Sequence, residues 1–193
     1  MLAVPVTEAS SRMTVYYAGI GSRETPKEVM DQMQQFAYQA AAKGWVLRSG
    51  GANGADTAFE MGCDHANGKK EIFLPWSGFN QNESPLYIVD DRAMDLAKEI
   101  HPAYNSLSRT ARLLISRNMH QVLGQTLNQP VACVVCWTQD GCESWTSYGR
   151  KTGGTGSAIA LASHQGAKVF NLRRPDRLID AIEFLLSYED FSK

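Results

Sequence analysis

Short hydrophobic runs alternate with amphipathic stretches along the whole chain. Runs rich in β-branched and aromatic residues predict five strands, at residues 14–21, 45–51, 70–76, 131–141 and 167–172. Between and after them, apolar residues recur at helical spacing and predict helices at 25–44, 54–68, 90–100, 108–127, 156–166 and 175–190. Strands that alternate with helices imply right-handed crossovers and a parallel sheet with helices on both of its faces. The predicted fold class is therefore α/β, with a single Rossmann-like, doubly wound, mainly parallel sheet.

The start of the first predicted helix has the residues of a capping box. Thr25 stands at the expected N-cap, Pro26 at the first helical position and Glu28 three residues after the cap. Gly44 follows the last apolar position and predicts the helix end.

The length and composition fit one globular domain. The chain has 193 residues, of which 44% are hydrophobic and 20% charged, which suits a single core. We expect a flexible tail at residues 1–13 and one domain at 14–193. No apolar run approaches the roughly 20 residues that cross a bilayer, and the N-terminus lacks a signal-peptide pattern. The expected protein is cytoplasmic and makes no membrane contact.

The four cysteines are expected in the core rather than at a metal. Cys133 and Cys136 have metal-ligand spacing, but they lie inside the apolar run VACVVCW, where cysteine behaves as a small hydrophobe. No second pair of cysteines or histidines completes a zinc site. We therefore expect no metal.

Glycine-rich segments follow three of the five predicted strands. In parallel sheets ligands bind outside the carboxyl ends of the strands, and glycines followed by a helix N-terminus let backbone N–H groups approach an anion. A nucleotide or its phosphate is the expected ligand, with Trp137 placed to stack on a base. The candidate binding residues in these segments are Gly21, Ser22, Arg23, Ser49, Gly50, Gly51, Ala52, Asn53, Gly54, Thr152, Gly153, Gly154, Thr155, Gly156 and Ser157.

The two common nucleotide fingerprints are absent. No Lys-Ser or Lys-Thr follows Gly54, as a P-loop requires, and Glu24 stands where the third glycine of a dinucleotide motif would be. These departures argue against an ordinary NAD or ATP enzyme, and no cofactor is expected. The net charge of −1 also argues against gripping a long nucleic-acid backbone, whereas a nucleotide or a short strand needs only local positive charge.

Three stretches together suggest a family: SGGANGAD (49–56), SRNMHQVLG (116–124) and the last glycine-rich loop and helix (152–162). They resemble the loops of the SLOG superfamily, and most closely those of the core of DNA-processing protein A (DprA/Smf). The resemblance implies a Rossmann-like fold and a short single-stranded DNA or nucleotide as partner. It also implies backbone contacts by Arg117 and Asn118 and, since such cores commonly self-associate, a homodimer.

A more distant resemblance is to the Lonely Guy phosphoribohydrolases, which cleave the base from a nucleoside monophosphate. TGGTGSAIA (152–160) keeps the glycines and a hydroxyl of their PGGxGTxxE signature but has Ala160 in place of the catalytic glutamate. An N-glycosidase would then depend on Asp56 or Glu60, although a glutamate on a helix is more often a solvated residue. Sequestration of a nucleotide without chemistry is a third alternative.

Overall fold

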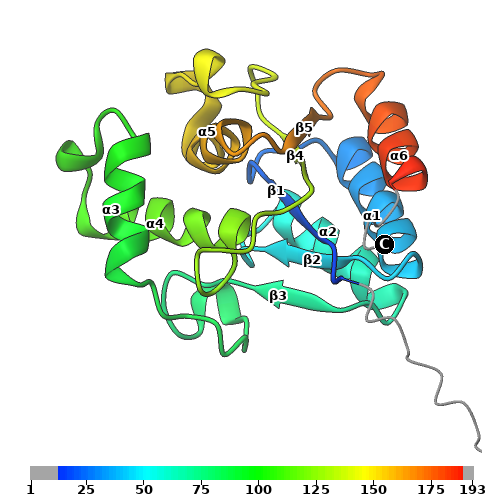
Figure 1. The fold of residues 1–193 in the computed structure, drawn as a ribbon, viewed down its shortest axis with the longest axis horizontal. Helices are drawn as coiled ribbons and strands as arrows, with labels where there is room; N and C mark the ends of the chain where they lie inside the picture. The colour runs from blue at the N-terminus through cyan, green and yellow to red at the C-terminus, as the bar shows by residue number, and fades with distance from the viewer. Residues whose placement is uncertain (1–12, 189–193) are drawn as a thin grey trace, which may run out of the picture.

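The computed structural model describes residues 13–188 and contains one sheet of parallel strands in the order β3-β2-β1-β4-β5 (Figure 1). The strands lie within the predicted hydrophobic runs, which confirms the predicted fold class. Their bounds are β1 (Tyr16–Gly21), β2 (Val46–Ser49), β3 (Lys70–Ile72), β4 (Cys133–Trp137) and β5 (Lys168–Asn171).

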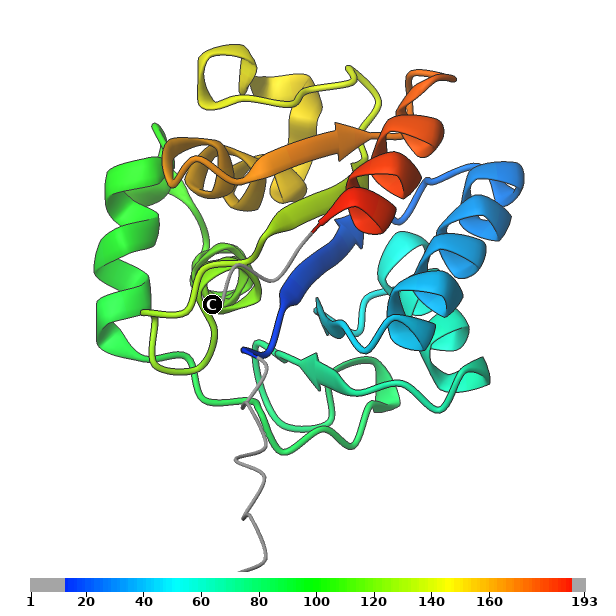
Figure 2. The same cartoon turned by 45° about the vertical axis from the view of Figure 1, so that its right-hand side comes forward.

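Helices cover both faces of this sheet. On one face lie α1 (Lys27–Ala42), α2 (Ala55–His65) and α6 (Arg177–Ser187), and on the other lie α4 (Arg109–Leu123) and α5 (Gly156–His164) (Figures 1 and 2). The remaining helix, α3 (Asp91–Ile100), packs outside α4 and α5 rather than on the strands. Within residues 13–188, none of these helices has the length and apolar character needed to cross a membrane.

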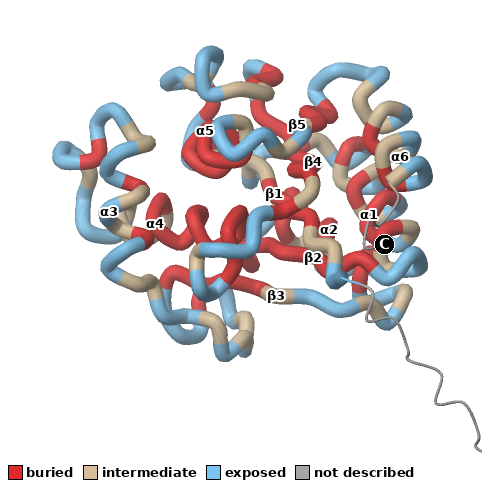
Figure 3. Tube along the Cα trace, viewed as in Figure 1, coloured by how far each residue is buried: buried red, intermediate tan, exposed pale blue. Residues whose placement is uncertain are grey.

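Alternation along the central strands divides the hydrophobic core in two. On β1, Tyr17 packs toward α1 and α2, whereas Ala18 and Ile20 pack toward α4 and α5. On β4, Cys133 and Cys136 are fully buried on opposite faces, as expected for cysteines of a core strand. Figure 3 shows the buried strands enclosed by helices whose outer surfaces are exposed.

The predicted capping box at the start of α1 is wrong. Pro26, with φ −58° and ψ 148°, is the N-cap and no side chain caps the helix. The Thr25 hydroxyl instead donates to the carbonyl oxygen of Ser22 at 2.7 Å. Thr25 therefore closes the turn after β1, and the helix begins two residues later.

Several other predicted segments differ at their ends. The predicted tail lies outside the described residues except for Met13, and so do the last two residues of the helix predicted at 175–190. The helix predicted at 108–127 ends at Leu123, where Gly124 turns the chain with φ +76°. The strand predicted at 131–141 ends at Trp137, and the segment after it contains two 3-10 turns, Trp145–Ser147 and Arg150–Thr155.

The strand order reverses at β1. The chain runs outward from β1 to β2 and β3, and then returns to place β4 on the other side of β1. The paired ends of these strands, Gly21 and Trp137, lie in register. A crevice at such a switch point is where open α/β sheets bind their ligands.

Candidate functional site

A cavity of about 430 Å³ borders the residues that follow β1, in the region of the switch point. Its volume lies within the range of about 300–1,000 Å³ that is usual for small-molecule sites. The segments around it come from the turn after β1, the start of α2, one face of α4 and the turn before α5. They contribute Ile20, Gly21, Ser22, Arg23, Glu24, Ala52, Asp56, Leu114, Ile115, Arg117, Asn118, Gln121, Thr152, Gly153, Gly154 and Thr155.

Eleven of the residues predicted from the sequence line this cavity. They are Gly21, Ser22, Arg23, Ala52, Asp56, Arg117, Asn118, Thr152, Gly153, Gly154 and Thr155. The structure therefore brings together the turn after β1, the arginine-asparagine pair and the last glycine-rich turn.

The other predicted residues lie outside the cavity lining, for identifiable reasons. The Ser49 hydroxyl donates to Gly19 O at 2.6 Å, and Asn53 Oδ1 accepts from Asn80 Nδ2 at 2.8 Å. Trp137 is 8% exposed and belongs to the hydrophobic core on the face of the sheet that α1, α2 and α6 cover. Five more lie in the same loops without bordering the cavity: Gly50, Gly51, Gly54, Gly156 and Ser157.

Glu60 points to a different part of the surface from Asp56. Its carboxylate accepts from Lys70 Nζ at 2.8 Å and from Asn82 Nδ2 at 3.2 Å. Glu60 is thus neither freely solvated nor part of the cavity. The two acids on α2 do not share one site.

The glycines of the first loop are explained by packing inside the protein. A Cβ at Gly50 would lie 2.5 Å from Arg117 Nη1, and a Cβ at Gly54 would lie 2.7 Å from Ser22 O. Gly54 also has φ +84°, which L side chains rarely adopt. This loop is glycine-rich because other protein atoms approach its backbone closely.

The carboxyl group of Asp56 accepts a backbone N–H of the first loop that could otherwise bind an anion. Its side chain is 3% exposed, and Oδ2 accepts from the backbone N–H of Ala52 at 3.3 Å. Burial raises the pKa of Asp56 to about 6, while Arg117 and backbone hydrogen bonds act in the opposite direction. A carboxyl group that titrates near neutral pH therefore forms part of the cavity wall.

Arg117 and Asn118 connect the two glycine-rich loops. Arg117 Nη1 donates to Gly50 O at 2.5 Å, and its Nε donates to Asn118 Oδ1 at 3.1 Å. Asn118 Nδ2 in turn donates to Gly154 O at 2.7 Å. Burial lowers the pKa of Arg117 to about 10, and the nearby Asp56 opposes this shift. Much of the hydrogen-bonding capacity of this pair therefore positions the walls of the cavity.

Gly153 and Gly154 of the second glycine-rich turn are exposed, unlike Gly50 and Gly51 of the first loop. Gly153 has φ +69°, and nothing lies within 4 Å of the position of a Cβ there. A Cβ at Gly154 would meet only Ile115 Cδ1, at 4.0 Å. Packing within the protein therefore does not require glycine at 154. Its bare backbone lines the cavity just before α5, where N–H groups favour anions.

Hydrogen bonds to Asp140 fix the position of this turn. Thr152 Oγ1 donates to Asp140 Oδ2 at 2.6 Å and accepts from the backbone N–H of Gly149 at 3.0 Å. Asp140 Oδ1 also accepts from Thr138 Oγ1 at 2.8 Å. Burial opposes ionisation of Asp140, but the hydrogen bonds from Thr152 and Thr138 prevail and lower its pKa.

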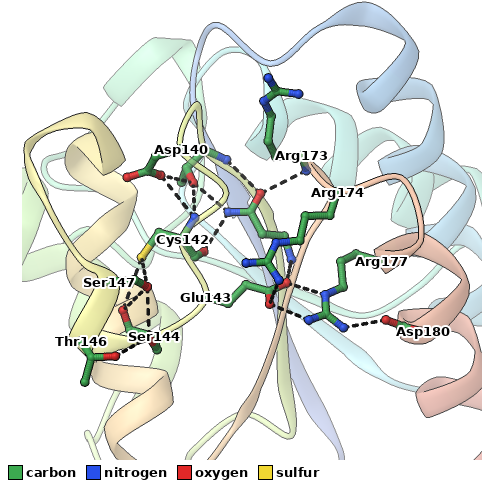
Figure 4. Close-up of polar contacts among 12 residues, drawn as sticks. Asp140, Cys142, Glu143, Ser144, Thr146, Ser147, Arg173, Arg174, Arg177 and Asp180 are labelled. Carbon is green, nitrogen blue, oxygen red and sulfur yellow. Dashed lines mark hydrogen bonds and ion pairs between the residues drawn. The ribbon is translucent and has the colours of Figure 1, made fainter.

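A second cluster anchors the same segment to α6, as Figure 4 shows. Glu143 forms ion pairs with Arg177 at 2.8 Å and Arg174 at 3.4 Å, and Arg177 also contacts Asp180. The Glu143 carboxylate accepts from the backbone N–H of Asn171 at the end of β5. The segment between β4 and the exposed Gly153 and Gly154 is thus held by the hydrogen bonds of Asp140 and by the contacts of Glu143 with α6 and β5.

Thr152→Val should destabilise the fold by about 1–3 kcal/mol, because it removes the two hydrogen bonds of the buried Thr152 hydroxyl, to Asp140 and from the Gly149 N–H, each worth about 0.5–1.5 kcal/mol. Urea unfolding followed by tryptophan fluorescence measures the change. Thr155→Val is the matched control, since the Thr155 side chain makes no hydrogen bond within residues 13–188. Equal midpoints for the two variants would contradict a positioning role for Thr152.

Five residues of the cavity were missed in the sequence: Ile20, Glu24, Leu114, Ile115 and Gln121. The helical period could have found two of them, because Leu114 and Gln121 lie three or four positions from Arg117 and Asn118 on the same face of α4. Glu24 was noted only as a departure from a motif, yet it brings a second carboxylate to the cavity.

Three solved structures resemble this fold. DNA processing protein A from Streptococcus pneumoniae is 20% identical with a TM-score of 0.48, and the match covers 90% of this chain and 56% of that one. A molybdenum cofactor binding protein from Rippkaea orientalis is 16% identical with a TM-score of 0.43, over 92% and 100% of the two chains. DNA processing protein A from Helicobacter pylori, described by its single-stranded DNA binding mode, is 13% identical with a TM-score of 0.41, over 91% and 82%.

This chain thus spans little more than half the length of the Streptococcus protein. No protein-family model matches the sequence, and no curated protein matches it. At 13–20% identity, residues at equivalent positions of a binding site commonly differ, and these likenesses do not identify a ligand for this chain.

Proposed function

We propose that the cavity binds a nucleotide through its phosphate, either free or at the end of a short single strand. One observation carries this proposal: the bare backbone of Gly153 and Gly154 lines the cavity although packing does not require glycine at 154. Arg23, exposed on the same cavity, supplies a guanidinium that suits a phosphate. Backbone N–H groups at a helix N-terminus and an arginine are a common combination for phosphate recognition.

The charges of the cavity favour one orientation of this ligand. Asp56 accepts the Ala52 N–H in the first loop, and its carboxylate would repel a phosphate placed there. The phosphate therefore belongs at the turn formed by Gly153, Gly154 and Thr155, beside Arg23. Asp56 is then free to accept a hydrogen bond from a sugar hydroxyl or a base amino group.

Two substitutions test the phosphate position. Arg23→Ala should weaken binding of nucleoside monophosphates about 10-fold to 100-fold, because hydrogen bonds to charged groups contribute about 1.5–3 kcal/mol. Gly154→Ala should also weaken binding, because its methyl group would stand on the cavity wall between the phosphate and the backbone N–H groups. Isothermal titration calorimetry with a panel of the four ribonucleotides and deoxyribonucleotides measures the loss. Lys168→Ala is the control, since Lys168 is exposed at the amino end of β5. Unchanged affinity in both test variants would refute the proposal.

A second candidate function is hydrolysis of the N-glycosidic bond of the same ligand. The observation in its favour is the carboxyl group of Asp56, whose pKa of about 6 suits a general base at neutral pH. Ala160, at the position of the catalytic glutamate in the Lonely Guy signature, is 2% exposed and does not line the cavity. Asp56 would therefore have to act without a carboxylate from that position.

Chromatography of nucleoside monophosphates after incubation separates hydrolysis from binding. Released base that disappears in Asp56→Asn but persists in Glu60→Gln would establish the hydrolase. Intact nucleotide recovered from the protein after purification would instead favour sequestration. Binding without released base would leave the first proposal in place.

A further inference from the structure

The side-chain amide of Gln121 borders the cavity without a hydrogen-bond partner. Gln121 is 2% exposed and lies on the cavity side of α4. Among residues 13–188, no group donates to this amide or accepts from it, yet protein atoms do not fully enclose it. Buried polar groups are nearly always hydrogen-bonded in native proteins. An unpaired amide in the wall of a cavity therefore indicates a group of the ligand that pairs with it.

Arg117 brings a second unused donor to the same place. Residues four positions apart adjoin on a helix face, and a Cβ at Gly50 would lie 2.4 Å from Gln121 Nε2 and 2.5 Å from Arg117 Nη1. Nε and Nη1 of Arg117 donate to Asn118 Oδ1 and to the carbonyl oxygens of Gly50 and Phe73. Its Nη2 has no partner within the described part of the chain, and the residue lines the cavity.

Asp56 adds an acceptor beside these donors. A carboxylate has about four acceptor sites, and the backbone N–H groups of Ala52 and Gly21 occupy only part of them. Arg117 is the charged group that acts most strongly on this carboxyl group. Asp56, Arg117 and Gln121 are all buried, whereas the glycines of the phosphate turn are exposed. These three side chains form the polar floor of the cavity.

The polar floor matches a group that both donates and accepts hydrogen bonds. A phosphate offers acceptors only, so it would be repelled by Asp56. An amino group offers donors only and would leave Arg117 Nη2 and the Gln121 N–H groups unpaired. A hydroxyl group donates one hydrogen bond and accepts others, so it can pair with the carboxylate and with the neighbouring donors at once.

Asn118 spans the gap between the phosphate turn and the polar floor. Its Nδ2 donates to Gly154 O at 2.7 Å, and its Oδ1 accepts from Arg117 Nε at 3.1 Å. One amide group and its two hydrogen bonds thus separate the two places. In a nucleoside 5′-monophosphate the sugar hydroxyls are several bonds nearer to the phosphate than the polar edge of the base is. The sugar therefore suits this short separation, and Leu114 and Ile115 on the preceding turn of α4 offer apolar surface to the base.

We propose that the polar floor binds the 2′-hydroxyl of a ribose, so that the cavity selects ribonucleotides over deoxyribonucleotides and Gln121 determines this specificity. The inference rests on the proposed phosphate site. A deoxyribonucleotide leaves the donors and the acceptor of the floor unpaired in a buried place. Sites built to hydrogen-bond a hydroxyl group strongly reject the analogue that lacks it.

Isothermal titration calorimetry with ribose 5-phosphate and 2-deoxyribose 5-phosphate tests the sugar preference without a base. The same comparison is then made with each nucleoside monophosphate and its 2′-deoxy form. We expect the ribose member of each pair to bind about 10-fold to 100-fold more tightly, because the deoxy form leaves buried and charged groups unpaired. This comparison uses the wild-type protein and does not depend on the folding of a variant.

Gln121→Leu tests the residue, because leucine has a similar size and no polar atoms. The variant should reduce the ribose preference about 5-fold, the value of one hydrogen bond, and should leave affinity for the 2′-deoxy forms within about 2-fold. Gln125→Leu is the matched control, since Gln125 is exposed just beyond the end of α4. It should leave the preference unchanged, and circular dichroism verifies the fold of both variants.

The possible failures are distinguishable. Equal binding of the ribose and deoxyribose forms would overturn this inference and leave the phosphate site in place. Absence of binding by every ligand would overturn both proposals. A preference among bases that is the same for both sugars would show that the floor contacts the base and would also overturn the inference. A ribose preference that persists in Gln121→Leu would overturn the role of Gln121.

Discussion

Replacing Arg117 with alanine is expected to destabilise the protein by about 3–5 kcal/mol, the usual effect of removing one partner of a buried charge pair. Arg117 is 5% exposed and donates to Gly50 O at 2.5 Å and to Phe73 O at 2.8 Å. Its loss leaves both carbonyl groups without this donor and removes the positive charge nearest to buried Asp56. The substitution should also separate the two glycine-rich loops and abolish ligand binding.

Urea unfolding curves of the wild type and the variant measure this change. Arg109→Ala is the matched control, because Arg109 lies exposed on the same helix and should alter the free energy of unfolding by no more than about 0.5 kcal/mol. The double variant Arg117→Ala/Asp56→Asn should lose less than the sum of the two single variants, since no unpaired charge remains. A loss below 1 kcal/mol in Arg117→Ala would show that the guanidinium does not support the site.

The second large effect is a dependence of stability on pH that Asp56 creates. Its pKa is raised from 3.8 to about 6 by burial, so the folded state takes up a proton that the unfolded chain has lost in this range. The contribution of Asp56 is therefore complete below about pH 3.8 and is lost as the pH rises through about 6. Two pKa units at about 1.4 kcal/mol each give roughly 3 kcal/mol over the full window.

The difference in unfolding free energy between wild type and Asp56→Asn isolates this effect from other carboxylates. Between pH 4 and pH 7.5 the wild type should lose about 2–3 kcal/mol relative to the variant. Glu60→Gln is the control, because Glu60 lies in a surface ion pair with Lys70. A difference that stays constant with pH, or that grows in favour of the wild type, would show that Asp56 is not desolvated in solution.

The strands and most helices were predictable because their signals are local. A fully buried strand such as β4 needs an uninterrupted apolar run, and VACVVCW has no other simple interpretation. The capping box predicted at Thr25 was wrong because the partner of its hydroxyl lies outside the helix. Its hydroxyl had two competing partners, and the turn after β1 supplied the Ser22 carbonyl that the sequence pattern does not reveal.

The two glycine-rich loops have similar sequences, but their glycines have different surroundings in the folded protein. SGGANG and TGGTG both predicted a phosphate cradle, but Arg117 and Ser22 closely approach the glycines of the first. Only the second leaves a bare backbone on the cavity. Which atoms surround a glycine depends on segments distant in the chain, and no local pattern contains that information.

The sequence by itself determined the fold class and identified eleven of the residues that line the cavity. These follow from side-chain periodicity and backbone freedom, which act between near neighbours in the chain. The tertiary structure alone decided that Asp56 is buried beside Arg117 and that Glu60 belongs to another surface. Desolvation and pairing of charges depend on which distant segments meet, and only folding specifies those contacts.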